Sequence, residues 1–152
     1  MLIVSMTREY ANDIAEWVYD PPYEIYSMAS TDPEFLLQQT NGFVALVDGG
    51  VLIGYRSFGI DGQVPGFDYD DRALDTGGGL RPSLTGRGLG REAISTGLAY
   101  GTERFHPVAF RVTVASFNTR ATRVVTSLGF LHQAQFDAST DGRTYEVFTR
   151  LE

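Results

Sequence analysis

The chain has 152 residues, of which 43% are hydrophobic, and a net charge of -7. This length and apolar content are typical of one domain with a buried core, so we expect residues 1–152 to form a single domain. The absence of cysteine excludes disulfides, thiolate metal sites and a cysteine acyl-enzyme. No apolar run reaches the roughly 20 residues of a membrane span. We therefore expect a cytoplasmic protein with no metal site and no membrane contact.

The charge is unevenly distributed along the chain. Residues 1–80 contain three arginines and thirteen acidic residues, for a net charge of -10, whereas residues 81–123 contain seven arginines and two glutamates, for +5. The basic third is expected either to bind a polyanion or to be a solvated charged face, and nucleic acid is a poor candidate for so acidic a protein. The absence of lysine excludes Walker-type phosphate binding and Schiff-base chemistry.

The first half of the chain predicts a strand, two helices and a hairpin. Thr7 can cap a helix that presents Ile14, Trp17 and Val18 on one face, and Asp20-Pro21-Pro22 ends it. The expected ranges are strand 2–6, helix 8–19, a short helix or irregular segment 23–28, a short helix 32–39, and strands 43–48 and 51–58 joined by Gly49-Gly50.

The second half adds a loop, strands and two longer helices. Asn118 can cap a helix that ends before Gly129, and His106-Pro107 ends the helix before it. The expected ranges are loop 59–71, a strand within 72–82, a helix after Gly90, strand 108–114, a helix after Asn118, and strands 130–136 and 143–151. This order predicts an α/β (α+β) fold with a mixed, mostly antiparallel sheet of about six to seven strands and helices on both faces.

The most informative stretch is Leu84-Thr85-Gly86-Arg87-Gly88-Leu89-Gly90-Arg91-Glu92-Ala93, in which three alternating glycines lead into a helical pattern. Glycines allow successive backbone N–H groups to point at one ligand, and the helix start adds unsatisfied donors and a positive dipole end. The stretch predicts either a diphosphate cradle or a plain structural turn. The triple glycine 77–79 in the preceding strand suggests a bulge or a close ligand.

These residues resemble the GNAT superfamily of acyl-CoA N-acyltransferases over nearly the whole chain. The family's acyl-CoA motif, Arg/Gln-x-x-Gly-x-Gly/Ala after a strand and often a proline, resembles Arg81-Pro82-Ser83-Leu84-Thr85-Gly86-Arg87-Gly88-Leu89-Gly90. A second motif, an Asn-x-x-Ala helix that closes on Gly-Phe, resembles Asn118-Thr119-Arg120-Ala121 followed by Gly129-Phe130. Two positions differ from the family: Thr85 replaces the usual Gln or Arg, and Val125 replaces a tyrosine that acts as general acid in many members.

The resemblance implies an acetyl-CoA-dependent N-acetyltransferase in which an amine attacks the thioester directly in a ternary complex. It implies that the cofactor acetyl-CoA lies against the strand before the cradle, with its diphosphate on the cradle. The expected cofactor-binding residues are Gly78, Gly79, Leu80, Thr85, Gly86, Arg87, Gly88, Leu89, Gly90, Arg91, Asn118 and Arg123. Dimers are common in the family, so a homodimer is a further expectation.

Asp75 is the expected general base, because related enzymes often supply a carboxylate from this strand; Asp70 and Asp71 are alternatives. Tyr23 and Tyr26 are the expected substrate-binding residues, and the acidic excess of residues 1–80 favours a cationic amine, either a small molecule or a peptide. His106 and His132 show no partner pattern for catalysis or a metal.

Two other functions remain open from the sequence. The first is a non-catalytic acyl-CoA sensor, which the missing tyrosine at Val125 would suit. The second is a Rossmann dinucleotide domain, which is disfavoured because the glycines come past mid-chain rather than at the first strand-to-helix turn.

Overall fold

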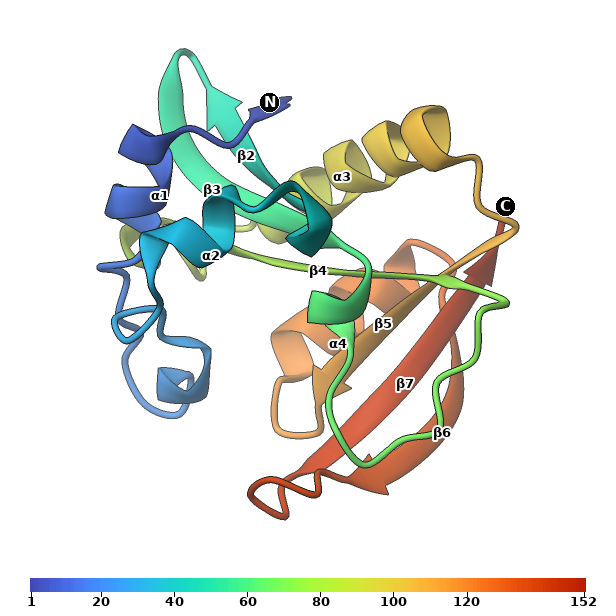
Figure 1. The fold of residues 1–152 in the computed structure, drawn as a ribbon. Coiled ribbons are helices and arrows are strands. Elements are labelled where there is room, and N and C mark those ends of the chain that lie inside the picture. The colour runs from blue at the N-terminus through green and yellow to red at the C-terminus, as the bar shows by residue number, and fades with distance from the viewer.

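The computed structural model describes residues 1–152 as one seven-stranded sheet with four α-helices, in the strand order β1-β2-β3-β4-β5-β7-β6 (Figure 1). Only β4 and β5 are parallel neighbours, which confirms a mixed and mostly antiparallel sheet. The elements are β1 (Leu2–Ser5), α1 (Arg8–Ile14), α2 (Pro33–Leu37), β2 (Phe43–Asp48), β3 (Val51–Phe58), β4 (Leu74–Leu80), α3 (Gly90–Phe105), β5 (Ala109–Ala115), α4 (Thr119–Ser127), β6 (Leu131–Asp137) and β7 (Thr144–Leu151). None of these helices combines the length and apolarity of a membrane span.

Helices cover both faces of the sheet because alternate strand residues are apolar on each side. Ala45 and Val47 of β2 pack with Ile14 of α1 and Leu36 of α2 on one face. On the other face the apolar strand residues pack under α3 and α4, whose contributions include Ala93, Leu98 and Val125. Figure 1 shows α1 and α2 on one side of the sheet and α3 and α4 on the other.

The first helix is shorter than its sequence pattern predicts, because it ends at Ile14 rather than near residue 19. Trp17 is buried, but its indole N–H turns back to Asp13, and the exposed fraction of Val18 is 58%. The prediction that Val18 belongs to the apolar face of this helix is therefore wrong. The early end frees Tyr19 to reach across the sheet, where its hydroxyl donates to the carbonyl of Leu80.

Most other boundaries follow the predicted ranges. The hairpin strands β2 and β3 have the expected ends, with Gly49 and Gly50 in the left-handed region at the turn. Asp32 caps α2, and Asn118 caps α4 through a bond from the Ala121 amide. Gly129, with φ of 90°, follows the end of α4 as predicted.

The strands β4 and β5 separate shortly after they begin. Their register includes only Leu74 with Phe110 and Asp75 with Arg111, although each strand has seven residues. Beyond Asp75 the two strands diverge, as Figure 1 shows, and their facing edges no longer pair. The result is a split in the sheet that is closed near Asp75 and open toward Leu80.

Candidate active site

The cradle, residues Gly86 to Gly90, has the backbone conformation that its glycines predict. Gly86 and Gly88 have φ of 73° and 81°, in the left-handed region that favours glycine. Helix α3 then begins at Gly90, and its N-cap, Leu89, provides no side-chain cap. The first N–H groups of α3 are therefore available to an anion at the positive end of the helix dipole.

Beyond the paired residues, the backbone of β4 directs polar groups without a strand partner toward the split. The Arg81 N–H donates to Ile53 of β3, and the carbonyl of Asp75 accepts from Gly59. Because bonding alternates along an antiparallel strand, these odd-numbered residues face β3, and Thr76, Gly78 and Leu80 direct their polar backbone groups toward β5. A side chain at Gly78 would place its Cβ 2.3 Å from the carbonyl oxygen of Tyr55, so only glycine fits there.

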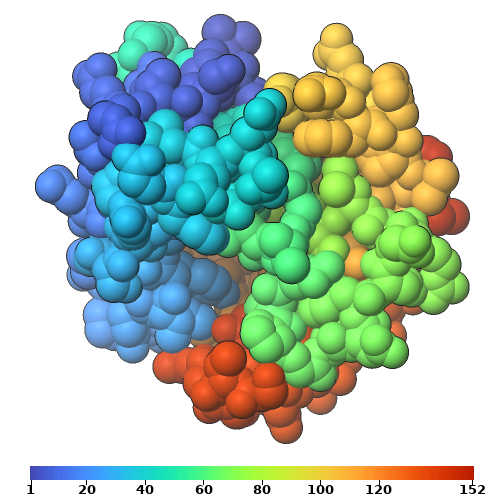
Figure 2. All heavy atoms as spheres, in the orientation of Figure 1, coloured from blue at the N-terminus to red at the C-terminus, as the bar shows by residue number.

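A cavity of about 460 Å³ joins the split, the cradle and the segment after α1. Figure 2 shows the surface hollowed beside the blue segment that follows α1. Ten of the twelve predicted cofactor residues line it: Gly78, Gly79, Leu80, Thr85, Gly86, Gly88, Leu89, Gly90, Asn118 and Arg123. The two exceptions are Arg87 and Arg91, which lie outside the lining with exposed side chains.

Arg120, which was not among the predicted site residues, lines the cavity instead. Its guanidinium lies 4.1 Å from the ring centroid of Tyr23, and a Cβ at Gly86 would be 2.9 Å from its Nη1. This stacking places a cation directly beside the cradle. The signal that could have found it is its position two residues after Asn118, in the first turn of α4.

The hydroxyl of Thr85, the residue that departs from the family motif, donates to the carbonyl of Pro82. Arg81, the arginine of the same motif, forms an ion pair with Asp13 at 2.7 Å and lies over the Trp17 ring. The Arg81 guanidinium and the Trp17 indole lower the pKa of Asp13, against the opposing effect of its burial. Arg81 therefore fastens α1 to β4.

Four tyrosines, among them both predicted substrate residues, line the cavity: Tyr19, Tyr23, Tyr26 and Tyr55. Burial raises the pKa of Tyr19 to about 12 and also raises the pKa of Tyr55. The lining contains no carboxylate and no imidazole. The tyrosine hydroxyls are therefore the neutral proton donors that the cavity lining offers to a bound ligand.

The Tyr26 hydroxyl is bound to Asn118, whose amide has a fixed orientation. The Asn118 Oδ1 atom accepts from the backbone of Ala121, which leaves Nδ2 to donate to the Tyr26 oxygen at 3.2 Å. The hydroxyl of Tyr26 is thus an acceptor in this contact, and its own proton remains available for donation. Burial raises the pKa of Tyr26, against smaller lowering effects from Asn118 and the backbone of Ala115.

Helix α4 itself supplies no such donor. Val125 is only 2% exposed and packs in the core under α3 and α4. The residues of α4 and its N-cap that reach the cavity are Asn118, Arg120, Ala121, Arg123 and Val124.

Arg56 of β3 also lines the cavity, and its exposed fraction is only 6%. Its Nη2 is 3.3 Å from the Thr76 hydroxyl, its Nε has no partner, and none of the ion pairs of the chain includes it. Burial lowers the pKa of Arg56 to about 10, which leaves it charged at neutral pH. Arg56 was not among the predicted site residues, although an arginine inside an apolar strand pattern is a visible signal.

Asp75 lies at the closed end of the split between β4 and β5 and does not line the cavity. Both of its carboxylate oxygens accept from Arg111, at 2.6 and 2.8 Å, and Gln63 donates a third hydrogen bond. Asp75 and Arg111 are both 5% exposed, and the Tyr69 ring covers the guanidinium. This buried, fully bonded pair argues against the predicted role of Asp75 as general base.

The alternatives to Asp75 also lie outside the cavity. Asp70 binds Arg72 and Arg111, and the Arg72 contacts lower the pKa of Asp70 to about 2. Asp71 is exposed in the same loop. No group of three or more His, Cys, Asp or Glu side chains is arranged to hold a metal ion.

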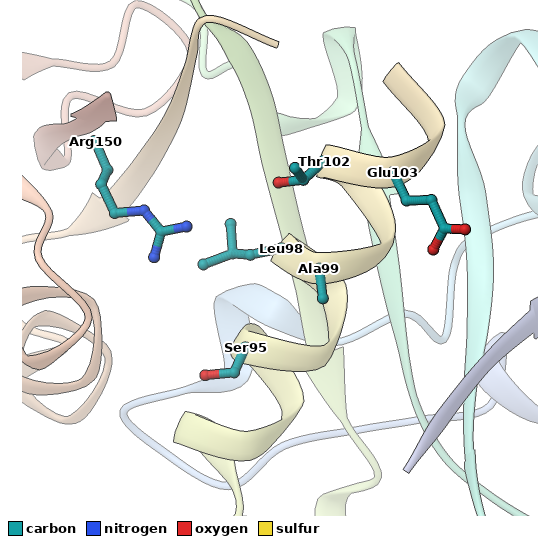
Figure 3. A pocket seen from close by; sticks show the side chains of 6 residues that line it. All are labelled: Ser95, Leu98, Ala99, Thr102, Glu103 and Arg150. Atoms are coloured by element: carbon teal, nitrogen blue, oxygen red, sulfur yellow. The ribbon is translucent and has the colours of Figure 1, made fainter. Parts of the chain in front are cut away.

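A second pocket, of about 430 Å³, is lined by residues of α3 and by Arg150 of β7 (Figure 3). Its one cation, Arg150, extends toward Leu98, but its guanidinium already donates to Glu152 and to the carbonyl of Leu128. The pocket therefore offers an anionic ligand no unsatisfied cation.

Solved structures with the same fold are acetyltransferases. The chain matches AAC(6')-Ib in complex with ribostamycin and coenzyme A at TM-score 0.77 and 15% identity, covering 99% of this chain and 93% of that one. It matches a chimera of the Vibrio cholerae spermidine N-acetyltransferase SpeG with hSSAT at TM-score 0.74 and 17% identity, covering 99% and 96%. It matches yncA, a putative acetyltransferase from Salmonella typhimurium with its cofactor acetyl-CoA, at TM-score 0.70 and 20% identity, covering 98% and 92%.

No curated protein matches the chain in sequence. The model of the acetyltransferase (GNAT) family matches residues 9–130, which include the split, the cradle and α4. The chain therefore belongs to the acetyltransferase (GNAT) family, whose members use acetyl-CoA.

Proposed function

We propose that this protein transfers the acetyl group of acetyl-CoA to a primary amine by direct attack in a ternary complex. The observation that carries the proposal is the single cavity that connects the cradle, the split and a tyrosine-lined region. A cofactor and an acceptor can therefore meet inside one space without a covalent enzyme intermediate.

The cofactor fits the residues at one end of this cavity. Its diphosphate would be bound by the N–H groups of Gly86 to Gly90, with Arg120 and Arg123 as charge partners. Its pantetheine arm would hydrogen-bond to the edge of β4 at Gly78 and at the N–H of Leu80, where the backbone has no strand partner and the Leu80 carbonyl is already bound by Tyr19. We assign no direct diphosphate contact to Arg87 and Arg91, whose effect would act through their charge alone.

The acceptor would enter beside Tyr23 and Tyr26, whose rings both pack against Phe117. In the reaction the amine nitrogen bonds to the thioester carbon, the carbon–sulfur bond breaks, and the sulfur takes up a proton. Tyr26 is the proposed proton donor, because its oxygen accepts from Asn118 while its own proton is free. The amine loses its proton to water, since no carboxylate or imidazole lines the cavity.

The test is thiol release from acetyl-CoA across a panel of amines, with mass spectrometry to detect the acetylated product. Polyamines, aminoglycosides and peptides with a free N-terminus cover the amine classes of interest. Amine-dependent thiol release that matches product formation supports the proposal. Thiol release that is the same without amine would reflect hydrolysis and would reject it.

A sensor that binds acyl-CoA without turnover is the second candidate. The observations that favour it are the core position of Val125 and the cavity without a conventional base. Tight acetyl-CoA binding with no turnover of any amine in the panel would select this function.

A further inference from the structure

Arg56 is a buried cation at the closed end of the split. It is paired in register with Gly78 of β4, and its Nη2 approaches Thr76, the first residue of β4 beyond the paired end. None of the ion pairs of the chain includes Arg56, and no acidic residue lines the cavity around it. The charge is therefore not balanced by the protein.

Two glycines make room for this side chain. A Cβ at Gly97 of α3 would be 2.9 Å from the Arg56 Nε atom, and a Cβ at Gly78 would be 2.7 Å from its Nη1 atom. Any other residue at either position would displace the guanidinium. Nη1 makes no hydrogen bond to the protein and lies beside Gly78, which lines the cavity, so this nitrogen is directed at a ligand in the split.

An isolated buried charge is costly unless a partner of opposite charge is supplied. An acetyl group would bring only a methyl group and one neutral carbonyl oxygen to this cation. A carboxylate would neutralise the charge and accept the paired hydrogen bonds that a guanidinium is shaped to give. The closed end of the split is the place where the acyl end of a thioester lying along β4 would reach.

We propose that Arg56 pairs with a carboxylate at the end of the acyl chain, so that the site also transfers short dicarboxylic acyl groups, such as malonyl or succinyl, from their CoA thioesters. This inference rests on the proposed function, because it requires the thioester to lie in the split. The amine nitrogen bonds to the thioester carbon, CoA leaves as the thiol after the sulfur is protonated, and the distal carboxylate stays ionised beside Arg56 throughout.

Calorimetric titration of the wild-type protein with acetyl-, butyryl- and succinyl-CoA tests this without turnover. Butyryl and succinyl have the same number of carbons, so their comparison isolates the carboxylate. We expect succinyl-CoA to bind at least about tenfold more tightly than butyryl-CoA, because a buried carboxylate–guanidinium pair increases the binding affinity by more than about tenfold. Equal or weaker binding of succinyl-CoA, with acetyl-CoA bound, overturns this inference alone, whereas no binding of any thioester overturns the proposed function as well.

Arg56→Met and Arg56→Lys then assign the effect to this side chain. Arg56→Met should lower the succinyl-to-butyryl affinity ratio to about one, and Arg56→Lys, which keeps the charge, should retain part of it. The control Arg120→Met removes a cation near the cradle and should weaken all three thioesters equally. A ratio that is unchanged in Arg56→Met overturns the inference; if that variant fails to fold, the wild-type comparison still decides.

A carboxylate on the acceptor could satisfy Arg56 in the same way. Turnover of acetyl-CoA with an amino acid and with its amide separates the two sources. We expect no preference for the free carboxylate that depends on Arg56. Such a preference, lost in Arg56→Met, would place the carboxylate on the acceptor and overturn the assignment to the acyl chain.

Discussion

The side-chain amide of Asn118 donates a hydrogen bond to the hydroxyl oxygen of Tyr26 over 3.2 Å, although 92 residues separate them in the chain. Asn118 is the N-cap of α4, and its Oδ1 atom is held by the Ala121 amide. One residue therefore ends the β5–α4 turn and fixes the position of a phenol in the cavity. The contact brings together two predicted site residues, one assigned to the cofactor and one to the acceptor.

Tyr26→Phe is expected to lower kcat by about 100-fold or more, because it removes the proton donor and leaves the ring packing in place. The dissociation constant of acetyl-CoA should change by less than about threefold, since this contact matters in the transition state. Steady-state kinetics and calorimetry measure the two quantities. Tyr23→Phe is the matched control, and equal losses of kcat in both variants would remove Tyr26 from its proposed role.

The pH dependence should be set by the acceptor. With no carboxylate or imidazole in the cavity lining, kcat/KM should rise about tenfold per pH unit below the pKa of the amine and then level off. The proton donor should remain active on the alkaline side, because burial raises the pKa of Tyr26 above its usual value of about 10. Profiles for two amines of different pKa measure this, and a shared inflection near pH 6 to 7 would instead reveal an enzyme base.

Gly88→Ala is expected to weaken acetyl-CoA binding by about tenfold or more, because an alanine at φ of 81° distorts the cradle backbone. A Cβ at Gly88 would meet no atom within 4 Å, so the folded protein should accommodate it at a cost of about 1 kcal/mol. Gly49→Ala, at φ of 57° in the β2–β3 turn and also without neighbours, is the control for strain. If both variants bind acetyl-CoA like the wild type, the diphosphate lies elsewhere.

Asp75→Asn is expected to destabilise the protein by about 3 kcal/mol, because it removes the buried carboxylate that binds Arg111 and leaves only the more exposed Asp70 paired with it. The folded variant should keep its kcat at a temperature well below its melting point. Urea denaturation and kinetics at low temperature separate the two effects. A variant of unchanged stability with a kcat reduced by a factor of 100 or more would restore Asp75 as the general base.

The elements that the sequence predicted well carry local signals. Gly49-Gly50 defines the hairpin, and Asn118 and Gly129 mark the ends of α4. The first helix was predicted too long because its end depends on contacts that no local pattern contains. The Tyr19 hydroxyl donates to the carbonyl of Leu80, 61 residues later in the chain, and this long-range contact outweighs the helical periodicity.

The predictions for the candidate site show the same difference between local and long-range signals. The cradle glycines are local in sequence, and all three line the cavity. The role of Asp75 depends on Arg111, which is 36 residues later and lies beside it only because β4 and β5 are parallel. The position of Arg56 depends on Gly78 and Gly97 from two other elements, so an analysis of single motifs could not find it.

A crystal structure of the protein with CoA tests the proposed cofactor site most directly. We predict that the diphosphate binds the N–H groups of Gly86 to Gly90, that the pantetheine lies along β4 at Gly78, and that the sulfur is within hydrogen-bonding distance of the Tyr26 hydroxyl. A CoA molecule bound outside the split, or a sulfur far from every hydroxyl group of the cavity, would contradict the account.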